Sequence, residues 1–251
     1  MRVACLMSSQ PQLPTLILTA HGSVDPRSSA TTHAVAERIR LLRPGLDVRV
    51  AFCEKSTPNL RDVLAGLRGP AVVTPLLLAS AFHARVDIPA IVAESAGLWQ
   101  AQVLQADTLG EDPRLVRVLR QRIGEIGVRA DDADTGVLVV AVGSSHAAAN
   151  ARTATVAGAL AAGSAWAGSE VAFATGPQPS VRDGIERLRR AGARRIAIAP
   201  WFIAPGRITD RVVALAQTAG VEMAKPLGAH RLLAATVLDR FDRAVAQRLA
   251  A

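Results

Sequence analysis

The sequence contains few aromatic residues, few cysteines and almost no lysine. Aromatic residues make up 3% of the 251 residues, and tyrosine is absent. The two cysteines, Cys5 and Cys53, are too few for a disulfide framework or a cysteine-rich metal cluster. No uninterrupted apolar run reaches the roughly 18 residues that a membrane span needs, and the N-terminal stretch does not resemble a signal peptide. We therefore expect a cytoplasmic protein with no membrane segment.

The charge is strongly basic but carries no sign of a nucleic-acid partner. The formal net charge is +8, and only Lys55 and Lys225 among the 29 basic residues are lysines. The arginines are scattered, and no basic run alternates with aromatic residues as in a nucleic-acid-binding surface. A cluster of arginines that meets a small polyanion is compatible with this charge. No phosphate-binding glycine motif follows a predicted strand, so we expect no ATP.

Half of the residues are hydrophobic, and alanine, valine and leucine supply most of them. Short apolar strands alternate with amphipathic helices, which predicts an α/β fold with parallel, Rossmann-like sheets and right-handed crossovers. The expected strands are 16–19, 46–53, 71–79, 137–142, 171–174 and 195–204. The expected helices begin at Asp25-Pro26, near Pro58, after Asp87 and at Asp112-Pro113, and a closing helix covers 231–249.

The two halves of the chain are similar when one is shifted by 121 residues. Residues 20–23 then align with 141–144, 51–52 with 172–173, and 61–62 with 182–183. A constant offset over some forty residues indicates a duplicated α/β unit. We expect two similar domains, 1–128 and 136–251, joined by a polar linker within 127–135.

Three metal-binding side chains follow the predicted strands of the first half. His21 comes after the first strand, Glu54 after the second, and His83 in the loop after the third. The carboxyl ends of parallel strands meet at one edge of a sheet, where ligands bind in such folds. Two imidazoles and a carboxylate suit Fe²⁺, Co²⁺, Ni²⁺ or Zn²⁺, and three protein ligands leave coordination positions open.

Each of these residues also has a structural interpretation. A histidine at a strand end is often a hydrogen-bonding residue, and Glu54 could interact with a helix dipole. The repeat favours function, because the second half has Val142 and Thr175 at the positions of His21 and Glu54 while the surrounding residues are kept. His83 has no histidine counterpart either.

Three segments together resemble the sirohydrochlorin chelatases of siroheme and cobalamin synthesis, in their long two-unit form. The resemblance implies two chelatase-like domains, with His21, Glu54 and His83 holding the incoming metal. Val24 departs from the family, many of whose members have a basic residue there. The segments are His21-Gly-Ser-Val-Asp-Pro-Arg27, Ala51-Phe-Cys-Glu54 and Pro75-Leu-Leu-Leu-Ala-Ser-Ala-Phe-His83-Ala-Arg-Val-Asp-Ile-Pro89.

The resemblance implies ATP-independent insertion of a divalent metal into sirohydrochlorin, and we favour Fe²⁺ and siroheme. Two pyrrole protons must leave, and a neutral His21 or His83 can accept them. Sirohydrochlorin carries eight carboxylates, for which Ser23, Arg27 and Arg85 are candidate contacts, with Arg207 a further one. For each arginine, a solvated surface charge is the alternative.

Other functions use the same residues. Cobalt insertion for cobalamin synthesis needs no different donors, and a non-catalytic carrier of metal or tetrapyrrole would also keep them. A metal-dependent hydrolase would need a further acid or base beside a bound water, and no motif for one is evident. The sequence does not indicate an oligomeric state.

Overall fold

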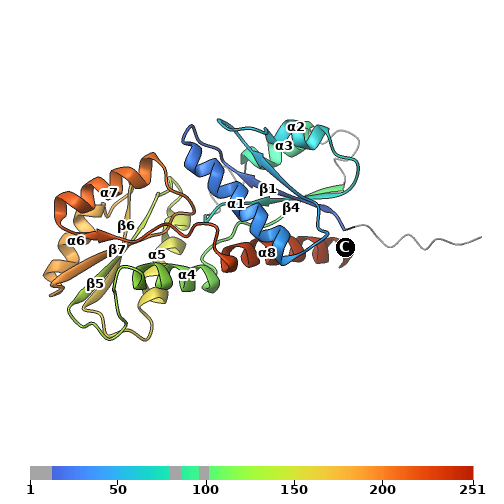
Figure 1. Ribbon diagram of the computed structural model, residues 1–251. Coiled ribbons are helices and arrows are strands. Elements are labelled where there is room, and N and C mark those ends of the chain that lie inside the picture. The colour runs from blue at the N-terminus through green and yellow to red at the C-terminus, as the bar shows by residue number, and fades with distance from the viewer. Residues whose placement is uncertain (1–12, 80–85, 96–101, 251) are drawn as a thin grey trace, which may run out of the picture.

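The computed structural model describes residues 13–79, 86–95 and 102–250, which form two α/β units side by side (Figure 1). Each unit has a four-stranded sheet, of order β2-β1-β3-β4 in the first and β6-β5-β7-β8 in the second. All the strand pairs of both sheets are parallel. The predicted fold class is therefore confirmed. None of the helices in the described ranges is long and apolar enough to cross a membrane.

Strands and helices alternate along the chain, as the sequence predicts. The first unit's strands are β1 (Thr15–Ala20), β2 (Val48–Phe52), β3 (Ala71–Pro75) and β4 (Val103–Gln105), and its helices are α1 (Pro26–Leu42), α2 (Leu60–Ala65), α3 (Ile88–Ser95) and α4 (Pro113–Gly124). The second unit's strands are β5 (Thr135–Ala141), β6 (Gly168–Phe173), β7 (Arg195–Pro200) and β8 (Glu222–Met223), and its helices are α5 (Ala147–Ala161), α6 (Val181–Arg190), α7 (Arg207–Ala219) and α8 (Arg231–Ala250).

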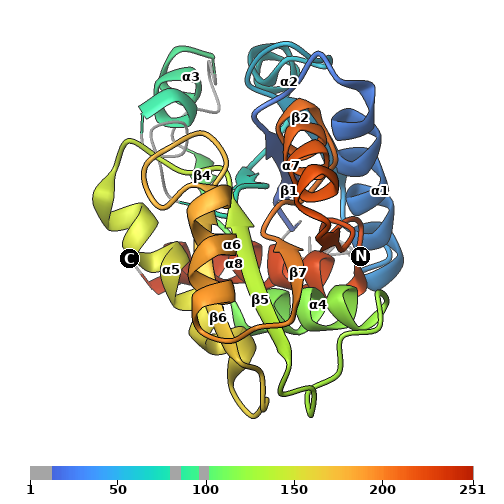
Figure 2. The ribbon, with the colours of Figure 1, turned by 90° about the vertical axis from the view of Figure 1, so that its left-hand side faces the viewer.

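Both faces of each sheet are covered, so the central strands are apolar on both sides. In β1, Leu16 and Leu18 belong to one core cluster and Ile17 to another, and all three side chains are fully buried. This is the alternation that a two-sided buried strand requires. The equivalent strand β5 divides its side chains in the same way. Helices α6 and α7 cover the outer face of the second sheet (Figure 2).

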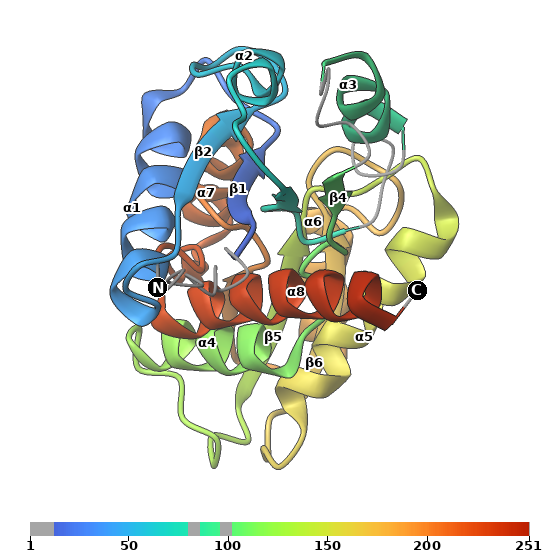
Figure 3. The same cartoon turned by 90° about the vertical axis from the view of Figure 1, so that its right-hand side faces the viewer.

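The two units exchange one helix each. Helix α8, the end of the chain, packs against α1, β3 and β4 of the first unit (Figure 3). Helix α4, which ends the first half of the sequence, packs against β7 and α5 of the second unit and also contacts α8. The largest core cluster therefore contains residues of both sheets. The division into domains 1–128 and 136–251 remains a prediction drawn from the sequence repeat. Each packed unit contains a helix from the other half of the sequence, so the packing does not follow this division.

Several element boundaries differ from those expected. The third strand ends at Pro75, and the four apolar residues after it line a cleft instead of extending the sheet. The seventh strand similarly ends at Pro200. The second helix begins after Asn59, whose side chain caps it by accepting from the backbone of Arg61. The edge strands β4 and β8 were not predicted, because three and two residues are too few to show a period.

Asp112 joins the exchanged helices. It caps α4 by accepting from the backbone of Arg114, and its carboxylate also receives the guanidinium groups of Arg114 and of Arg240 from α8, at 2.8 and 3.0 Å. Burial alone would raise the pKa of Asp112, but the hydrogen bonds from Arg114 and the charges of Arg114 and Arg240 outweigh it and lower the pKa to about 2. The side chain is 8% exposed, so its partners hold it as a buried ion.

We expect Asp112→Ala to reduce the free energy of unfolding by about 3–5 kcal/mol, because it breaks a buried ion pair and removes a helix cap. Since the folded pKa lies below the ordinary 3.8, the charge-dependent part of this contribution is present above about pH 4 and is lost as the pH falls through about 2. Urea unfolding of wild type and variant at several pH values measures the difference. The exposed Asp131, paired with Arg129, is the control, and its replacement is expected to have no measurable effect.

Candidate metal site

The hydrogen-bonded ladder between β1 and β2 continues beyond both strands and places residues 21 and 54 beside each other. The backbone amide of Cys53 donates to the carbonyl of Ala20, and that of Glu54 donates to the carbonyl of His21, both at 3.0 Å. Because the strands are parallel, these residues lie at the carboxyl edge of the sheet. The predicted meeting of His21 and Glu54 is thus explained by backbone pairing.

The side chains of His21 and Glu54 are within hydrogen-bond distance. Nε2 of His21 lies 2.9 Å from Oε1 of Glu54, and Nζ of Lys55 lies 2.5 Å from the same oxygen. The side chains of His21 and Glu54 are 33% and 47% exposed, so an ion can reach them from solvent. An imidazole and a carboxylate at this separation can both contact one divalent cation after a small rearrangement.

Gly22 allows the two loops to approach this closely. Its φ is +96°, in the left-handed region, and a β-carbon there would lie 1.7 Å from the carbonyl oxygen of Glu54. The next loop residue, Ser23, is tied to the loop after Glu54, because its amide donates to Oγ of Ser56 and its carbonyl accepts from that hydroxyl. The Oγ of Ser23 accepts from the amide of Asp25. The loops after β1 and β2 therefore form one connected structure.

Cys53, beside Glu54, is a weaker candidate for a ligand. Burial raises the pKa of its thiol to about 11, and the charges of Asp87 and Glu54 act in the same direction. Metal binding requires the thiolate, so binding of a cation by Cys53 would have to release the proton of this thiol. His21 and Glu54 need no such loss of a thiol proton.

Arg27, expected to contact substrate, lies between two carboxylates. It donates to Asp25, the N-cap of α1, at 3.0 and 2.6 Å, and to Asp210 in α7 of the other unit at 3.1 and 2.6 Å. The hydrogen bonds from Arg27 lower the pKa of Asp25 to about 2, with a further contribution from the charge of Arg207. Arg27 thus bridges the two units, a contact that the sequence did not indicate.

His83 and Arg85 lie outside the described residues, so their expected roles remain predictions. Within 13–79, 86–95 and 102–250 there is no group of three or more His, Cys, Asp or Glu side chains that could hold a metal ion. The structure thus brings together two of the three expected donors. Lys55, which the sequence analysis did not single out, contacts this pair.

The second unit repeats the backbone of this site without its donors. The amide of Thr175 donates to the carbonyl of Val142 at 3.0 Å, as that of Glu54 does to His21. Gly143 has the same φ of +96° as Gly22. The hydroxyl of Thr175 is used locally, since it donates to the carbonyl of Val142. The donor groups, and not the scaffold, distinguish the two sites.

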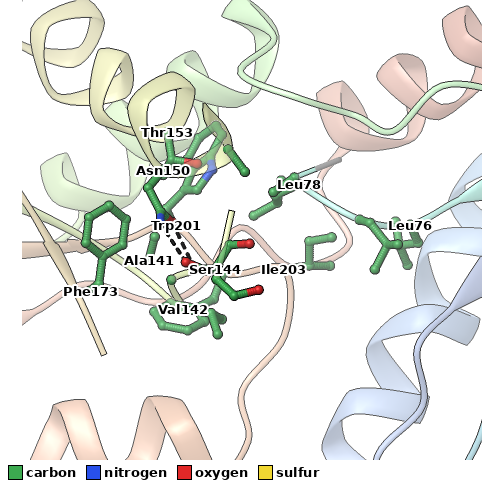
Figure 4. A pocket seen from close by; sticks show the side chains of 16 residues that line it. Leu76, Leu78, Ala141, Val142, Ser144, Asn150, Thr153, Phe173, Trp201 and Ile203 are labelled. Carbon is green, nitrogen blue, oxygen red and sulfur yellow. Dashed lines mark hydrogen bonds between the residues drawn. The ribbon is translucent and has the colours of Figure 1, made fainter. Parts of the chain in front are cut away.

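A cleft of about 440 Å³ lies between the units. Leu76 and Leu78, from the loop after β3, form one wall, and Val142 and Ile203 of the second unit lie opposite (Figure 4). The amide of Leu76 donates to the carbonyl of Thr19, so this wall begins next to β1, the strand that His21 follows. His21 and Glu54 do not themselves line this cleft. It is a mainly apolar space, and most of the residues that line it belong to the second unit.

Comparison with known proteins gives consistent matches. The CbiX family model matches residues 15–126 and again 136–244. A sirohydrochlorin ferrochelatase of Priestia megaterium is 26% identical over 206 residues, which are 78% of this chain and 76% of the relative. A sirohydrochlorin cobaltochelatase of the same organism is 24% identical over 212 residues, 80% of this chain and 67% of the relative. SirB from Bacillus subtilis, solved with Fe³⁺, has a TM-score of 0.79 at 21% identity and covers 95% of this chain and 98% of its own.

Proposed function

The chain belongs to the CbiX family, and we propose that it is a sirohydrochlorin chelatase that inserts a divalent metal into the tetrapyrrole without ATP. One observation carries this proposal. Nε2 of His21 and Oε1 of Glu54 lie 2.9 Å apart at the edge of the first sheet. The repeated backbone of the second unit has Val142 and Thr175 at these positions. The names of the two Priestia megaterium relatives support sirohydrochlorin as the substrate.

We propose that His21, Glu54 and His83 hold the incoming metal, which is a substrate of the reaction. Two nitrogens and one oxygen bind borderline divalent ions without selecting strongly among them. Three protein ligands leave positions where the tetrapyrrole can begin to coordinate the ion. The partial exposure of His21 and Glu54 suits an ion that must arrive and leave in every cycle.

We propose that a histidine of this site accepts protons during insertion. Two pyrrole N–H protons must leave as the metal enters, and a neutral imidazole is a suitable base near pH 7. Glu54 lies within hydrogen-bond distance of Nε2 of His21 and can orient that ring. His83 can share the role with His21.

The cleft is the proposed site of the macrocycle. Its apolar walls, which include Leu78 and Ile203, suit the face of a tetrapyrrole, and one wall begins at Leu76, whose amide donates to Thr19 of β1, the strand that His21 follows. The peripheral carboxylates would then contact Ser23, Arg27 and Arg85. Arg27 donates to both Asp25 and Asp210, so a substrate carboxylate would replace Asp210 as its partner.

We propose Fe²⁺ as the physiological metal and siroheme as the product, because the long two-unit form resembles the siroheme branch and one relative is named a ferrochelatase. Co²⁺ is the second candidate, since one of the relatives is named a cobaltochelatase. The donor set alone does not separate the two ions, because affinity order does not decide selectivity in cells.

The test is an anaerobic assay with sirohydrochlorin and either Fe²⁺ or Co²⁺, followed by the absorption of the macrocycle. We expect metal insertion well above the uncatalysed rate, and faster with Fe²⁺ than with Co²⁺ at equal concentrations. A faster reaction with Co²⁺ would assign the protein to cobalt insertion. Stoichiometric binding of sirohydrochlorin or metal without acceleration would overturn the enzymatic proposal in favour of a carrier.

A further inference from the structure

Lys55 follows Glu54 directly and has an unusual backbone conformation. Its φ is +59°, and among the described residues it is the only non-glycine residue with a positive φ. A β-carbon is disfavoured in this left-handed region, and lysine gains nothing there from local side-chain hydrogen bonding as asparagine or aspartate does. Such conformations occur preferentially at functional sites, where the surrounding structure imposes them.

The repeat shows what the backbone requires at this position. At the offset of 121 residues, Lys55 corresponds to Gly176, whose φ is +83°. The preceding residues make the same backbone hydrogen bond, Glu54 to His21 in one unit and Thr175 to Val142 in the other. The turn therefore calls for glycine in both units. The unit that has the donor residues carries a lysine against that preference.

The side chain of Lys55 is directed to the candidate metal ligand. Its Nζ lies 2.5 Å from Oε1 of Glu54, the same oxygen that lies 2.9 Å from Nε2 of His21. The lysine side chain is 51% exposed. Its ammonium can therefore leave Glu54 and be hydrated by solvent, and it needs no other protein group as a partner. An ammonium thus contacts the oxygen that a divalent ion would use.

We propose that Lys55 is an exchangeable counter-cation of the metal site, an inference that rests on the proposed chelatase function. The ammonium neutralises Glu54 in the metal-free protein, moves away when the divalent ion binds, and returns as the ion passes to the tetrapyrrole. In each exchange one cation–carboxylate contact forms as another breaks, and no electron is transferred. Lys55 thereby weakens metal binding and lowers the cost of giving the metal up, so it is a positioning residue.

Titration with Co²⁺ alone tests this inference, with cobalt absorption as the readout at fixed pH and ionic strength. We expect Lys55→Gln and Lys55→Gly to bind Co²⁺ about fivefold more tightly than wild type, the scale of a partly exposed ion pair. Lys55→Arg keeps the charge and is expected to retain wild-type affinity. The difference between Lys55→Gln and wild type should shrink as salt is added, because screening weakens competition between exposed charges.

The variants separate charge from backbone strain. Lys55→Gly removes both, whereas Lys55→Gln removes only the charge. Tighter binding in both supports the exchange, since a structural role for Lys55 would instead weaken binding when the side chain is lost. Unchanged or weaker binding in Lys55→Gln would overturn the proposal, as would tightening confined to Lys55→Gly. The chelatase function is judged separately, by the wild-type rate with sirohydrochlorin and by the loss of Co²⁺ binding in His21→Ala.

Discussion

Replacement of Glu54 by glutamine is expected to lower the rate of metal insertion at least about 100-fold. Loss of a residue that only hydrogen-bonds to a metal ligand already lowers metal affinity or activity about 10- to 100-fold, and Glu54 is a proposed ligand itself. The amide keeps the size of the side chain and can still meet Nε2 of His21, but it lacks the negative charge that attracts a divalent ion. The measurement is the initial rate of sirohydrochlorin metalation with Fe²⁺ under anaerobic conditions. His21→Ala is expected to cause a loss of similar or greater size, because it removes both a ligand and a candidate base.

The second unit provides a matched control. Thr175→Gln introduces the same side chain at the corresponding position of a backbone that makes the same hydrogen bond. Its exposed hydroxyl makes only the local bond to the carbonyl of Val142. We expect this variant to retain most of the wild-type rate. Equal losses in Glu54→Gln and Thr175→Gln would contradict the assignment of metal binding to the first unit.

Gly22→Ala is expected to cost about 2–5 kcal/mol of unfolding free energy and to abolish Co²⁺ binding. The added β-carbon would have to occupy a position 1.7 Å from the carbonyl oxygen of Glu54, at a φ of +96°. The loop after β2 must then move, and it takes Glu54 away from His21. Urea unfolding of the metal-free protein measures stability, and a Co²⁺ titration well below the unfolding midpoint measures the site.

Two other glycines serve to separate the two expected effects of Gly22→Ala, the loss of stability and the loss of Co²⁺ binding. A β-carbon on Gly143 would lie 2.1 Å from the carbonyl oxygen of Gly176, so Gly143→Ala is expected to destabilise the protein but to leave Co²⁺ binding intact. Gly45 has a φ of +85° with no atom within 4 Å of the added carbon, so Gly45→Ala measures the conformational penalty alone. Retention of wild-type Co²⁺ affinity in Gly22→Ala would show that the close approach of the loops is not required.

The meeting of His21 and Glu54 could be predicted because it depends on short-range rules. Apolar runs identify parallel strands, parallel strands end at one edge, and the residue after each strand is then brought to that edge. The repeat added a comparison within the chain itself, because Val142 and Thr175 occupy the same places. The family match, which extends over both halves, confirms the resemblance seen in the three segments.

Other features depend on contacts between residues far apart in the sequence, which a local sequence pattern does not reveal. Leu76 and Leu78 pack on the core and also line the cleft, and the sequence pattern cannot distinguish this position after β3 from burial within a strand. The bridge from Arg27 to Asp210 joins residues 183 apart in the sequence. Lys55 could have been noticed from the repeat, since it replaces a glycine, but its contact with Glu54 depends on the course of the loop.

The exchange of α4 and α8 affects the order in which the protein can mature during synthesis. The first sheet carries His21 and Glu54, yet one of its faces is covered by the last 20-residue helix of the chain. Until α8 has left the ribosome, β3 and β4 expose the apolar surface that it covers. Helix α4 likewise cannot pack against a sheet until β7 has been synthesised. The first sheet is therefore completed only after α8, which follows the whole second sheet in the sequence, has been made. The first unit depends on this later helix before it can present His21 and Glu54 at the edge of a fully covered sheet.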